Sequence, residues 1–147
     1  MITETPTLTI IPDGPTLRAV ALSVDSIRDD VLPHLREMRQ LMRTACGIGL
    51  AAPQVGISRR FFITGLRNLA LRTVINPTII RASGSSAVAV EGCLSFPGVR
   101  KHVLRPASIS CTFTDAAGTS HELVLHREDA RVFQHELDHL NGICISP

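Results

Sequence analysis

The sequence lacks any long apolar run, and this excludes a membrane-spanning helix. Its apolar stretches are broken by Arg, Asp or Pro well short of the roughly 18 residues that such a helix needs. Residues 1–6 also lack the basic and apolar regions of a secretory signal. We therefore expect a cytoplasmic protein without a membrane partner.

The chain also lacks a basic stripe and any C-x-x-C pair. Because the formal net charge is only +2 and charges of both signs are interspersed, we expect no direct nucleic-acid site. Four scattered cysteines argue against a zinc ribbon and weakly against a disulfide framework. Free cysteine often acts as a small buried hydrophobe, and we expect this of Cys46, Cys111 and Cys144.

What is present suits a single domain over residues 1–147, because 44% of the chain is hydrophobic and no repeat or linker interrupts it. Apolar residues at helical spacing over 25–45 predict an amphipathic helix whose regular part begins near 30–33, since Pro33 is unsuited to a helix interior. A second helix is expected over 128–140, and Gly142 ends it.

Between these helices, short apolar or alternating runs predict strands. Turn residues separate the runs at 76–77, 96–98 and 105–106, and 81–86 has the composition of a surface loop. Residues 115–118 predict a hairpin turn. The expected strands cover 61–64, 73–75, 87–90, 99–104, 108–114 and 121–126. We predict an α+β fold, with antiparallel strands around a central helix and one N-terminal amphipathic helix.

The strongest chemical signal is the H-E-x-x-H motif formed by His135, Glu136 and His139 within the second helix. Residues four apart share one helix face, so both imidazoles can bind one metal ion. Glu136 is then placed to accept a proton from a water molecule, as in metal-dependent hydrolases. Two surface histidines would be the alternative, but the apolar neighbours of the motif favour burial.

A catalytic site of this kind needs a third protein ligand and an open fourth position. Spacing alone does not choose among several candidates. Cys93 lies between glycine and proline residues, which can bring a thiolate and backbone N–H groups close to a ligand. The candidates are Cys93, Glu91, His102, His121 and His126.

Residues 47–56 form a third unusual segment, rich in glycine and alanine. It has no G-K-[ST] ending, so a nucleotide site is not expected. Small residues that end in Gln54 suit the wall of a cleft, where the amide N–H stabilises an oxyanion. A glycine-terminated helix followed by a buried turn is the structural alternative.

With these segments together, the chain resembles the peptide deformylase family. The family has three sequence blocks in this order, and they occur here at 47–54, 91–95 and 134–139. The resemblance extends to 11–13, 17–18 and 75–77 and so covers nearly the whole chain. It implies an enzyme that removes the formyl group from the N-terminal methionine of newly made polypeptides.

The resemblance also implies a ligand set and a cofactor. Cys93, His135 and His139 would bind one divalent metal, with water in the fourth position. Fe²⁺ is the usual metal of the family, while Zn²⁺, Ni²⁺ or Co²⁺ can occupy such a site, and the donor types do not separate iron from zinc.

Further roles follow from the same resemblance. Glu136 would be the general base and later the general acid, and Gln54 with the backbone N–H of Leu94 would stabilise the oxyanion. On the substrate side, Gly49 would pair with the extended peptide. Glu91 and Arg100 are also expected to contact substrate.

Two departures from the family leave alternatives open. Residues 127–131 read Arg-Glu-Asp-Ala-Arg, where relatives have glycine and apolar residues that line the methionine pocket. The alternatives are a deformylase-like amidase with another N-acyl substrate and a catalytically silent metal-binding homologue; a peptidase explains less of the sequence. The chain stops at Pro147 without the extension that helps dock longer relatives on the ribosome, so ribosome binding is not assumed. Separately, we expect a monomer.

Overall fold

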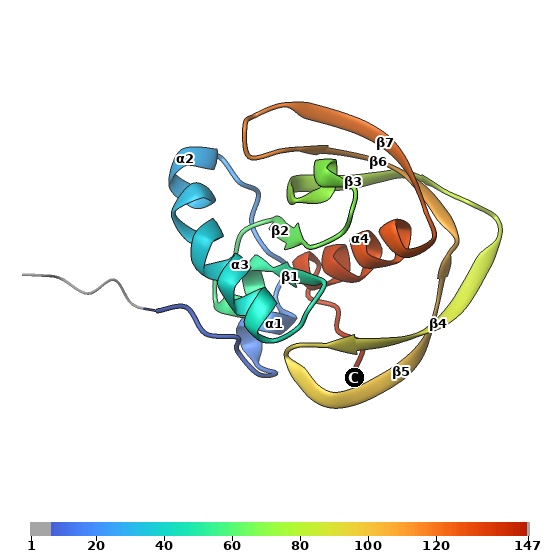
Figure 1. Cartoon of the computed structure of the whole chain (residues 1–147), viewed down its shortest axis with the longest axis horizontal. Helices are drawn as coiled ribbons and strands as arrows, with labels where there is room; N and C mark the ends of the chain where they lie inside the picture. The colour runs from blue at the N-terminus through green and yellow to red at the C-terminus, as the bar shows by residue number, and fades with distance from the viewer. Residues whose placement is uncertain (1–6, 147) are drawn as a thin grey trace, which may run out of the picture.

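Seven strands form two separate antiparallel sheets in the computed structural model, which describes residues 7–146 (Figure 1). A five-stranded sheet has the order β1-β2-β3-β6-β7, and the other two strands form a hairpin. The α+β class with antiparallel strands is therefore confirmed. The bounds are β1 Gly49–Ala51, β2 Phe61–Thr64, β3 Thr73–Ala82, β4 Ser86–Cys93, β5 Phe96–Pro106, β6 Ser108–Thr114 and β7 Ser120–His126.

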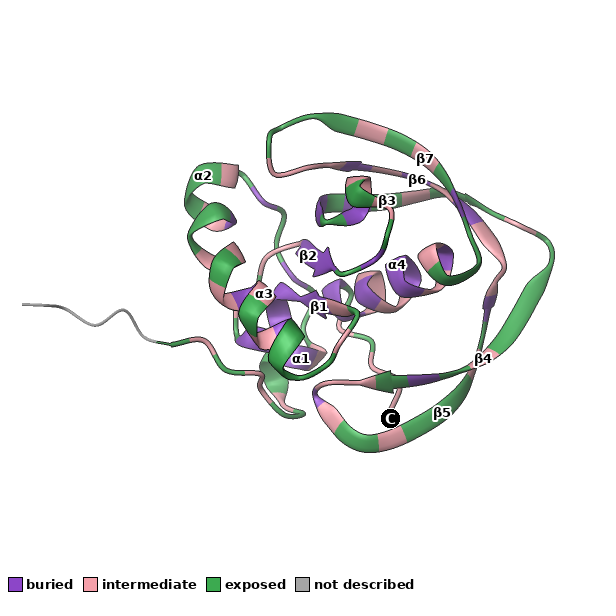
Figure 2. Ribbon diagram, viewed as in Figure 1, coloured by how far each residue is buried: buried purple, intermediate pink, exposed green. Residues whose placement is uncertain are grey.

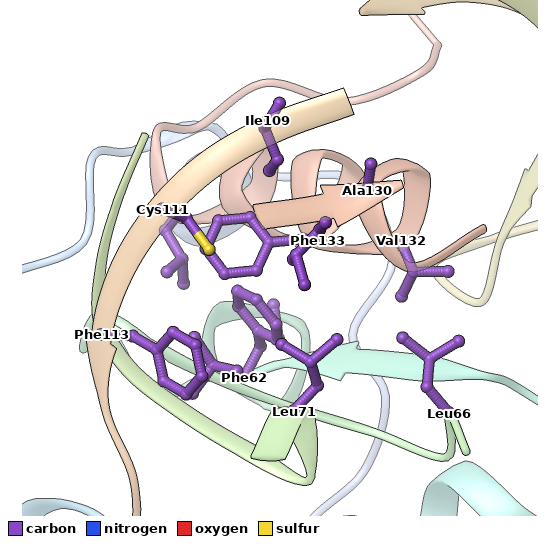
Figure 3. Close-up of a cluster of buried hydrophobic side chains, with 13 residues drawn as sticks. Phe62, Leu66, Leu71, Ile109, Cys111, Phe113, Ala130, Val132 and Phe133 are labelled. Atoms are coloured by element: carbon purple, nitrogen blue, oxygen red, sulfur yellow. The ribbon is translucent and has the colours of Figure 1, made fainter. Parts of the chain in front are cut away.

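The C-terminal helix α4, Arg127–Leu140, contacts strands of both sheets and lies between them (Figure 1). Its apolar face packs on the five-stranded sheet, where the Phe133 ring meets Phe62 edge to face at 5.4 Å between centroids (Figure 3). Figure 2 shows the purple, buried colour concentrated where α4 meets β1 and β2. The buried face of α4 thus results from the helical spacing of its apolar residues.

A second buried cluster lies on the other side of β1 and β2. Met38 and Met42 from α3, Leu35–Thr44, pack there with Leu50 and Phe61. Because β1 contributes Ala51 to one cluster and Leu50 to the other, this short strand is held from both faces. The position of β1 beside the site residues is therefore fixed.

The predicted helix over 25–45 is broken into three pieces, so its expected start near 30–33 is wrong. Helix α2, Ile27–Asp30, and the 3-10 helix η1, Leu32–His34, precede α3. The side chain of Ser26 caps α2 by accepting from the backbone N–H of Asp29 at 3.1 Å. Pro33 starts a new turn because its ring cannot occupy a helix interior. The short helices α1, Pro15–Arg18, η2, Ala52–Val55, and η3, Leu69–Leu71, were not predicted.

Strands β2 and β6 have the predicted bounds, and the turn at 115–118 is confirmed by the backbone bond from Asp115 N–H to the Thr119 carbonyl at 2.9 Å. The break expected at 76–77 is wrong. Strand β3 continues through it with a register shift, and Asn76 has φ +50° while its side chain bonds the backbone of Val24. The Asn-Pro pair is thus accommodated by a β-bulge instead of ending the strand.

Strands β4 and β5 are longer than predicted. The loop expected over 81–86 shrinks to residues 83–85, and the break expected at 96–98 lies inside β5. Composition misled here because the hairpin pairs its strands over their whole length, with Cys93 opposite Phe96. A tight turn at Leu94 and Ser95 therefore ends β4, and Cys93 stands at its tip.

Among the cysteines, Cys111 is buried as expected, and Cys144 is half-buried. Cys46 is exposed, so the prediction of burial is wrong for it; it sits at φ +56° in the turn after α3. No helix within residues 7–146 combines the length and hydropathy needed to span a membrane. The predictions made for residues 1–6 and for Pro147 lie outside the described residues.

Candidate active site and metal centre

Three side chains from two distant segments meet at one point. Cys93 stands at the tip of β4, and His135 and His139 lie one turn apart on α4. The ligand atoms of the three residues all lie within 4.8 Å of one another, and the Cys93 Sγ is 3.3 Å from His139 Nε2. Of the five candidates for a third ligand, Cys93 is the one that joins the two histidines.

The donor set fits a divalent metal. Two imidazoles and one thiol on a helix and a hairpin tip give three ligands beside a cavity, the arrangement of catalytic rather than structural sites. Burial lowers the pKa of His139 to about 3, so its ring is neutral, the form that binds metals. Burial also tends to lower the pKa of His135, but its hydrogen bonds to Cys93 and Glu91 prevail and raise it to about 10. A metal ion bound there would replace the proton of His135.

Glu91 lies behind His135 and does not join the group of three. Its Oε1 is 2.8 Å from His135 Nδ1, which leaves the Nε2 of that ring to face the Cys93 thiol. Arg105 donates to both carboxylate oxygens, at 2.6 and 2.8 Å, and Arg131 donates to Oε2 at 2.6 Å. Burial would raise the pKa of Glu91, but these bonds hold it well below its usual range. The residue is therefore a buried carboxylate that orients an imidazole.

Glu136 lines the same cavity and lies near Nε2 of the His135 ring, whereas Glu91 binds Nδ1. Its Oε1 is 3.9 Å from His135 Nε2, and its buried Oε2 has no hydrogen-bond partner among the described residues. Burial raises the pKa of this carboxyl to about 7. A group with this pKa can both accept and return a proton near neutral pH.

Gly49 explains how close the sheet comes to Glu136. A Cβ on Gly49 would lie 3.0 Å from Glu136 Oε1 and 3.1 Å from its Cγ, so a larger residue would push the carboxylate away. Gly49 opens β1, the edge strand of the five-stranded sheet. An extended peptide can therefore pair beside the carboxylate.

Gln54 closes the site from the 3-10 helix η2. Its Oε1 accepts from the backbone N–H of Ala51 at 3.0 Å, which orients its Nε2 toward Cys93 Sγ at 3.4 Å and Ser95 Oγ at 3.2 Å. The glutamine is only 1% exposed. The segment at 47–56 thus combines the strand β1, which was not predicted, with a buried turn, and Gly47, Gly49 and Gln54 line the cavity.

The cavity at this point has a volume of about 670 Å³. Leu94 lines it, and its side chain lies against Gly47, where a Cβ would come 2.7 Å from Leu94 Cδ1. Arg100 also lines it and packs over Gly92. His121 is not part of this site, because it binds Asp115 at 2.8 Å, and neither His102 nor His126 belongs to the group that could hold a metal.

Sequence reasoning missed four residues that touch the site. Ser95 meets Gln54, and Asp138 receives a bond from Arg105 at 2.9 Å. The signal for Ser95 and Asp138 was present, since both lie within matched blocks. No local pattern marks the two arginines, Arg105 and Arg131, whose partner Glu91 is 14 and 40 residues away.

Comparison with known proteins gives a consistent picture. The family model described as polypeptide deformylase matches residues 7–146. A peptide deformylase of Thermotoga petrophila is 43% identical over 131 residues, which is 89% of this chain and 79% of that protein.

Solved structures agree with the sequence match. The crystal structure of peptide deformylase from Thermotoga maritima superposes with a TM-score of 0.89 at 39% identity, covering 96% of each chain. A Met-Ala-Ser-bound class I type b peptide deformylase from Acinetobacter baumannii has a TM-score of 0.84 at 32% identity, covering 96% of this chain and 97% of that one. Since the family model spans nearly the whole chain and relatives share about two fifths of its residues, this chain belongs to the polypeptide deformylase family.

Proposed function

We propose that this chain is a metal-dependent hydrolase that removes the formyl group from the N-terminal methionine of nascent polypeptides. The observation that carries the proposal is the convergence of Cys93, His135 and His139 beside the buried Glu136, in a member of the deformylase family. The reaction takes water and an N-formyl amide and yields formate and a free amine.

Cys93 Sγ and the Nε2 atoms of His135 and His139 would hold one divalent ion. A metal bound there supplies Lewis acidity and lowers the pKa of water to about 7. Fe²⁺ is our proposal for the native ion, and Zn²⁺, Ni²⁺ or Co²⁺ would suit the same donors. Glu91 would keep His135 in the tautomer that presents Nε2 to the ion.

Glu136 would move the proton. As the water oxygen attacks the formyl carbon, the carboxylate accepts a water proton, and its pKa of about 7 suits this step. It then returns the proton to the amide nitrogen as the C–N bond breaks. Burial of Glu136 and its partnerless oxygen support the role, because no ion pair within the described residues competes for that atom.

Gln54 and Leu94 would stabilise the oxyanion that forms on the formyl oxygen. The Ala51 N–H orients the Gln54 amide, whose Nε2 donates to Cys93 Sγ and Ser95 Oγ and would exchange one of these bonds for the formyl oxygen. The backbone N–H of Leu94 follows Cys93 directly at the hairpin tip. Each such donor typically contributes about 3 kcal/mol to the transition state.

The substrate is proposed to be an extended N-formylmethionyl peptide that pairs with β1 at Gly49. The crystal structure of the Acinetobacter baumannii relative has Met-Ala-Ser bound, which supports a peptide substrate of this type. Arg100 and Glu91, which line the cavity on its β4–β5 side, would contact the peptide. We propose that one catalytic domain over residues 1–147 acts as a cytoplasmic monomer.

The test compares formyl-Met-Ala-Ser with acetyl-Met-Ala-Ser as substrates of the metal-loaded enzyme. We expect the formyl peptide to be cleaved with kcat/KM about 100-fold higher, within the range of about 10- to 200-fold that one methyl group typically produces. Equal rates would instead support the broader amidase. No cleavage of either peptide by protein with a full metal content would support the silent homologue.

A Glu136→Ala variant tests the mechanism. We expect it to retain the metal and to lose deformylation by at least about 100-fold, the low end of a general-base contribution. Metal content by elemental analysis separates loss of the base from loss of the ion. Wild-type activity in this variant would remove Glu136 from the proposed role.

A further inference from the structure

The β4–β5 hairpin is a sheet of its own, and within the described residues neither strand pairs with the five-stranded sheet. An isolated two-stranded hairpin is marginally stable at best. Cys93 stands at the tip of this hairpin, while His135 and His139 stand on α4. The distance between the thiol and the two imidazoles therefore depends on how the hairpin is attached to the helix.

Arg131 makes that attachment from α4 to the main chain of both strands. Its Nη2 donates to the Ala87 carbonyl of β4 at 2.8 Å, and its Nη1 donates to the Val103 carbonyl of β5 at 3.0 Å. Nη1 also donates to Glu91 Oε2 at 2.6 Å. The side chain is 17% exposed; its bonds to Glu91 and Val103 are partly buried, and its bond to Ala87 is exposed. A planar guanidinium can make this set of bonds, whereas a lysine ammonium lacks the fixed fork.

The same arginine acts on the metal ligands through Glu91. Arg131 lies four residues before His135, hence on the same face of α4. The two side chains bind the two oxygens of one carboxylate, Arg131 on Oε2 and His135 on Oε1. Fixing the carboxylate therefore also fixes the ring that would face the ion.

Arg105 has a different position in this arrangement. It belongs to β5, so its bonds to Glu91 of β4 lie within the hairpin, and it reaches α4 only through the half-exposed carboxylate of Asp138. Arg131 is the residue of the helix that binds the backbone of both strands.

We propose that Arg131 is a positioning residue of the metal centre, which holds the β4–β5 hairpin against α4 so that Cys93 stays within ligand distance of His135 and His139. The proposal rests on the metal ligands of the proposed function. It predicts that loss of Arg131 weakens metal retention more than it weakens the fold.

The experiment loads wild type, Arg131→Met and Arg39→Met with Co²⁺ and follows loss of the cobalt absorption bands after a chelator is added. Arg39 is the matched control, because it also joins a helix to a strand by bonding Thr73 Oγ1 and the Arg72 carbonyl, but outside the site. We expect Arg131→Met to release Co²⁺ about 10-fold faster, the low end of the effect of outer-shell changes. Arg39→Met should release it at the wild-type rate. Thermal unfolding of the metal-free proteins measures how far each change weakens the fold.

Arg131→Lys keeps the charge and serves if Arg131→Met fails to fold. It should release Co²⁺ faster than wild type, because one ammonium cannot hold both carbonyls and the carboxylate in this geometry. Wild-type release from a folded Arg131 variant would overturn the proposal, as would equal acceleration in Arg39→Met. If wild type itself bound no Co²⁺ with thiolate bands, the proposed metal site would fail, which is a separate outcome.

Discussion

Two carboxylate–histidine contacts of equal length occur in this molecule, and they differ in their surroundings. Glu91 and His135 meet at 2.8 Å beside the candidate metal centre, and Asp115 and His121 meet at 2.8 Å at the β6–β7 turn. The first pair has side chains 6% and 12% exposed, against 27% and 22% for the second.

The difference lies in what else binds each carboxylate. Two arginines also form ion pairs with Glu91, whereas Asp115 accepts hydrogen bonds from the backbone N–H groups of Ala117 and Thr119 in its own turn. Removing a partner leaves a buried charge in the first case and a charge that water can reach in the second. We therefore expect the Glu91–His135 contact to contribute more to stability and function than the Asp115–His121 contact.

The largest effect is expected for Glu91→Gln. The change removes the carboxylate that Arg105 and Arg131 share, and only Arg105 keeps another anion, Asp138. Breaking a buried ion pair in this way costs about 3 to 5 kcal/mol. Urea unfolding of the metal-free variant against metal-free wild type measures the loss. A cost below about 1 kcal/mol would place this buried pair in the same class as the exposed one.

A second, nearly as large effect concerns metal and activity. Since Glu91 orients His135, Glu91→Gln should also lower metal affinity by about 10- to 100-fold. Competition with a chelator gives the affinity, and Asp115→Asn is the control that should leave it unchanged. Equal affinities in the two variants would contradict the distinction between the pairs.

The double variant Glu91→Leu, Arg105→Met sharpens the comparison. Replacing a buried ion pair by apolar side chains of similar volume is often neutral or stabilising. We expect the free energy of unfolding to recover by about 1 to 4 kcal/mol relative to Glu91→Gln, while metal affinity stays low. Recovery of both quantities would mean that the cluster serves folding and not the site.

The smallest effect is expected for Asp115→Asn, at most about 1 kcal/mol near pH 7. The hydrogen bond to His121 lowers the pKa of Asp115, so the folded carboxyl ionises more easily than the unfolded one. Its contribution is therefore complete above the unfolded pKa of about 3.9 and disappears as the pH falls through the folded value. Urea unfolding of wild type and variant between pH 7 and pH 2 should converge at the acid end. A gap that widens in acid would reverse the assigned sign.

The parts of the site that depend on local spacing could be predicted. His135 and His139 share a helix face because they are four residues apart, and the apolar rows that bury this helix repeat at the same period. Cys93 could only be one of five candidates, because nothing in the 41 residues between Cys93 and His135 fixes where the hairpin tip lies. The resemblance to a family, and not the spacing, selected it.

The same division explains the errors. Composition placed breaks at 76–77 and 96–98, yet β3 and β5 pass through both, because pairing with neighbouring strands outweighs local turn preference. In the N-terminal half the reverse happened: Pro33 interrupts the helix more completely than the apolar spacing suggested.

By itself, the sequence determined the class of fold, the helix that presents two imidazoles and a carboxylate, and membership of a family through its three blocks. Only the tertiary structure decided that Arg105 and Arg131 surround Glu91, that Gly49 leaves room for Glu136, and that the hairpin tip meets α4. The reason is physical. Spacing along one helix fixes directions over a few residues, whereas contacts between segments 14 to 87 residues apart depend on how sheet, hairpin and helix pack together.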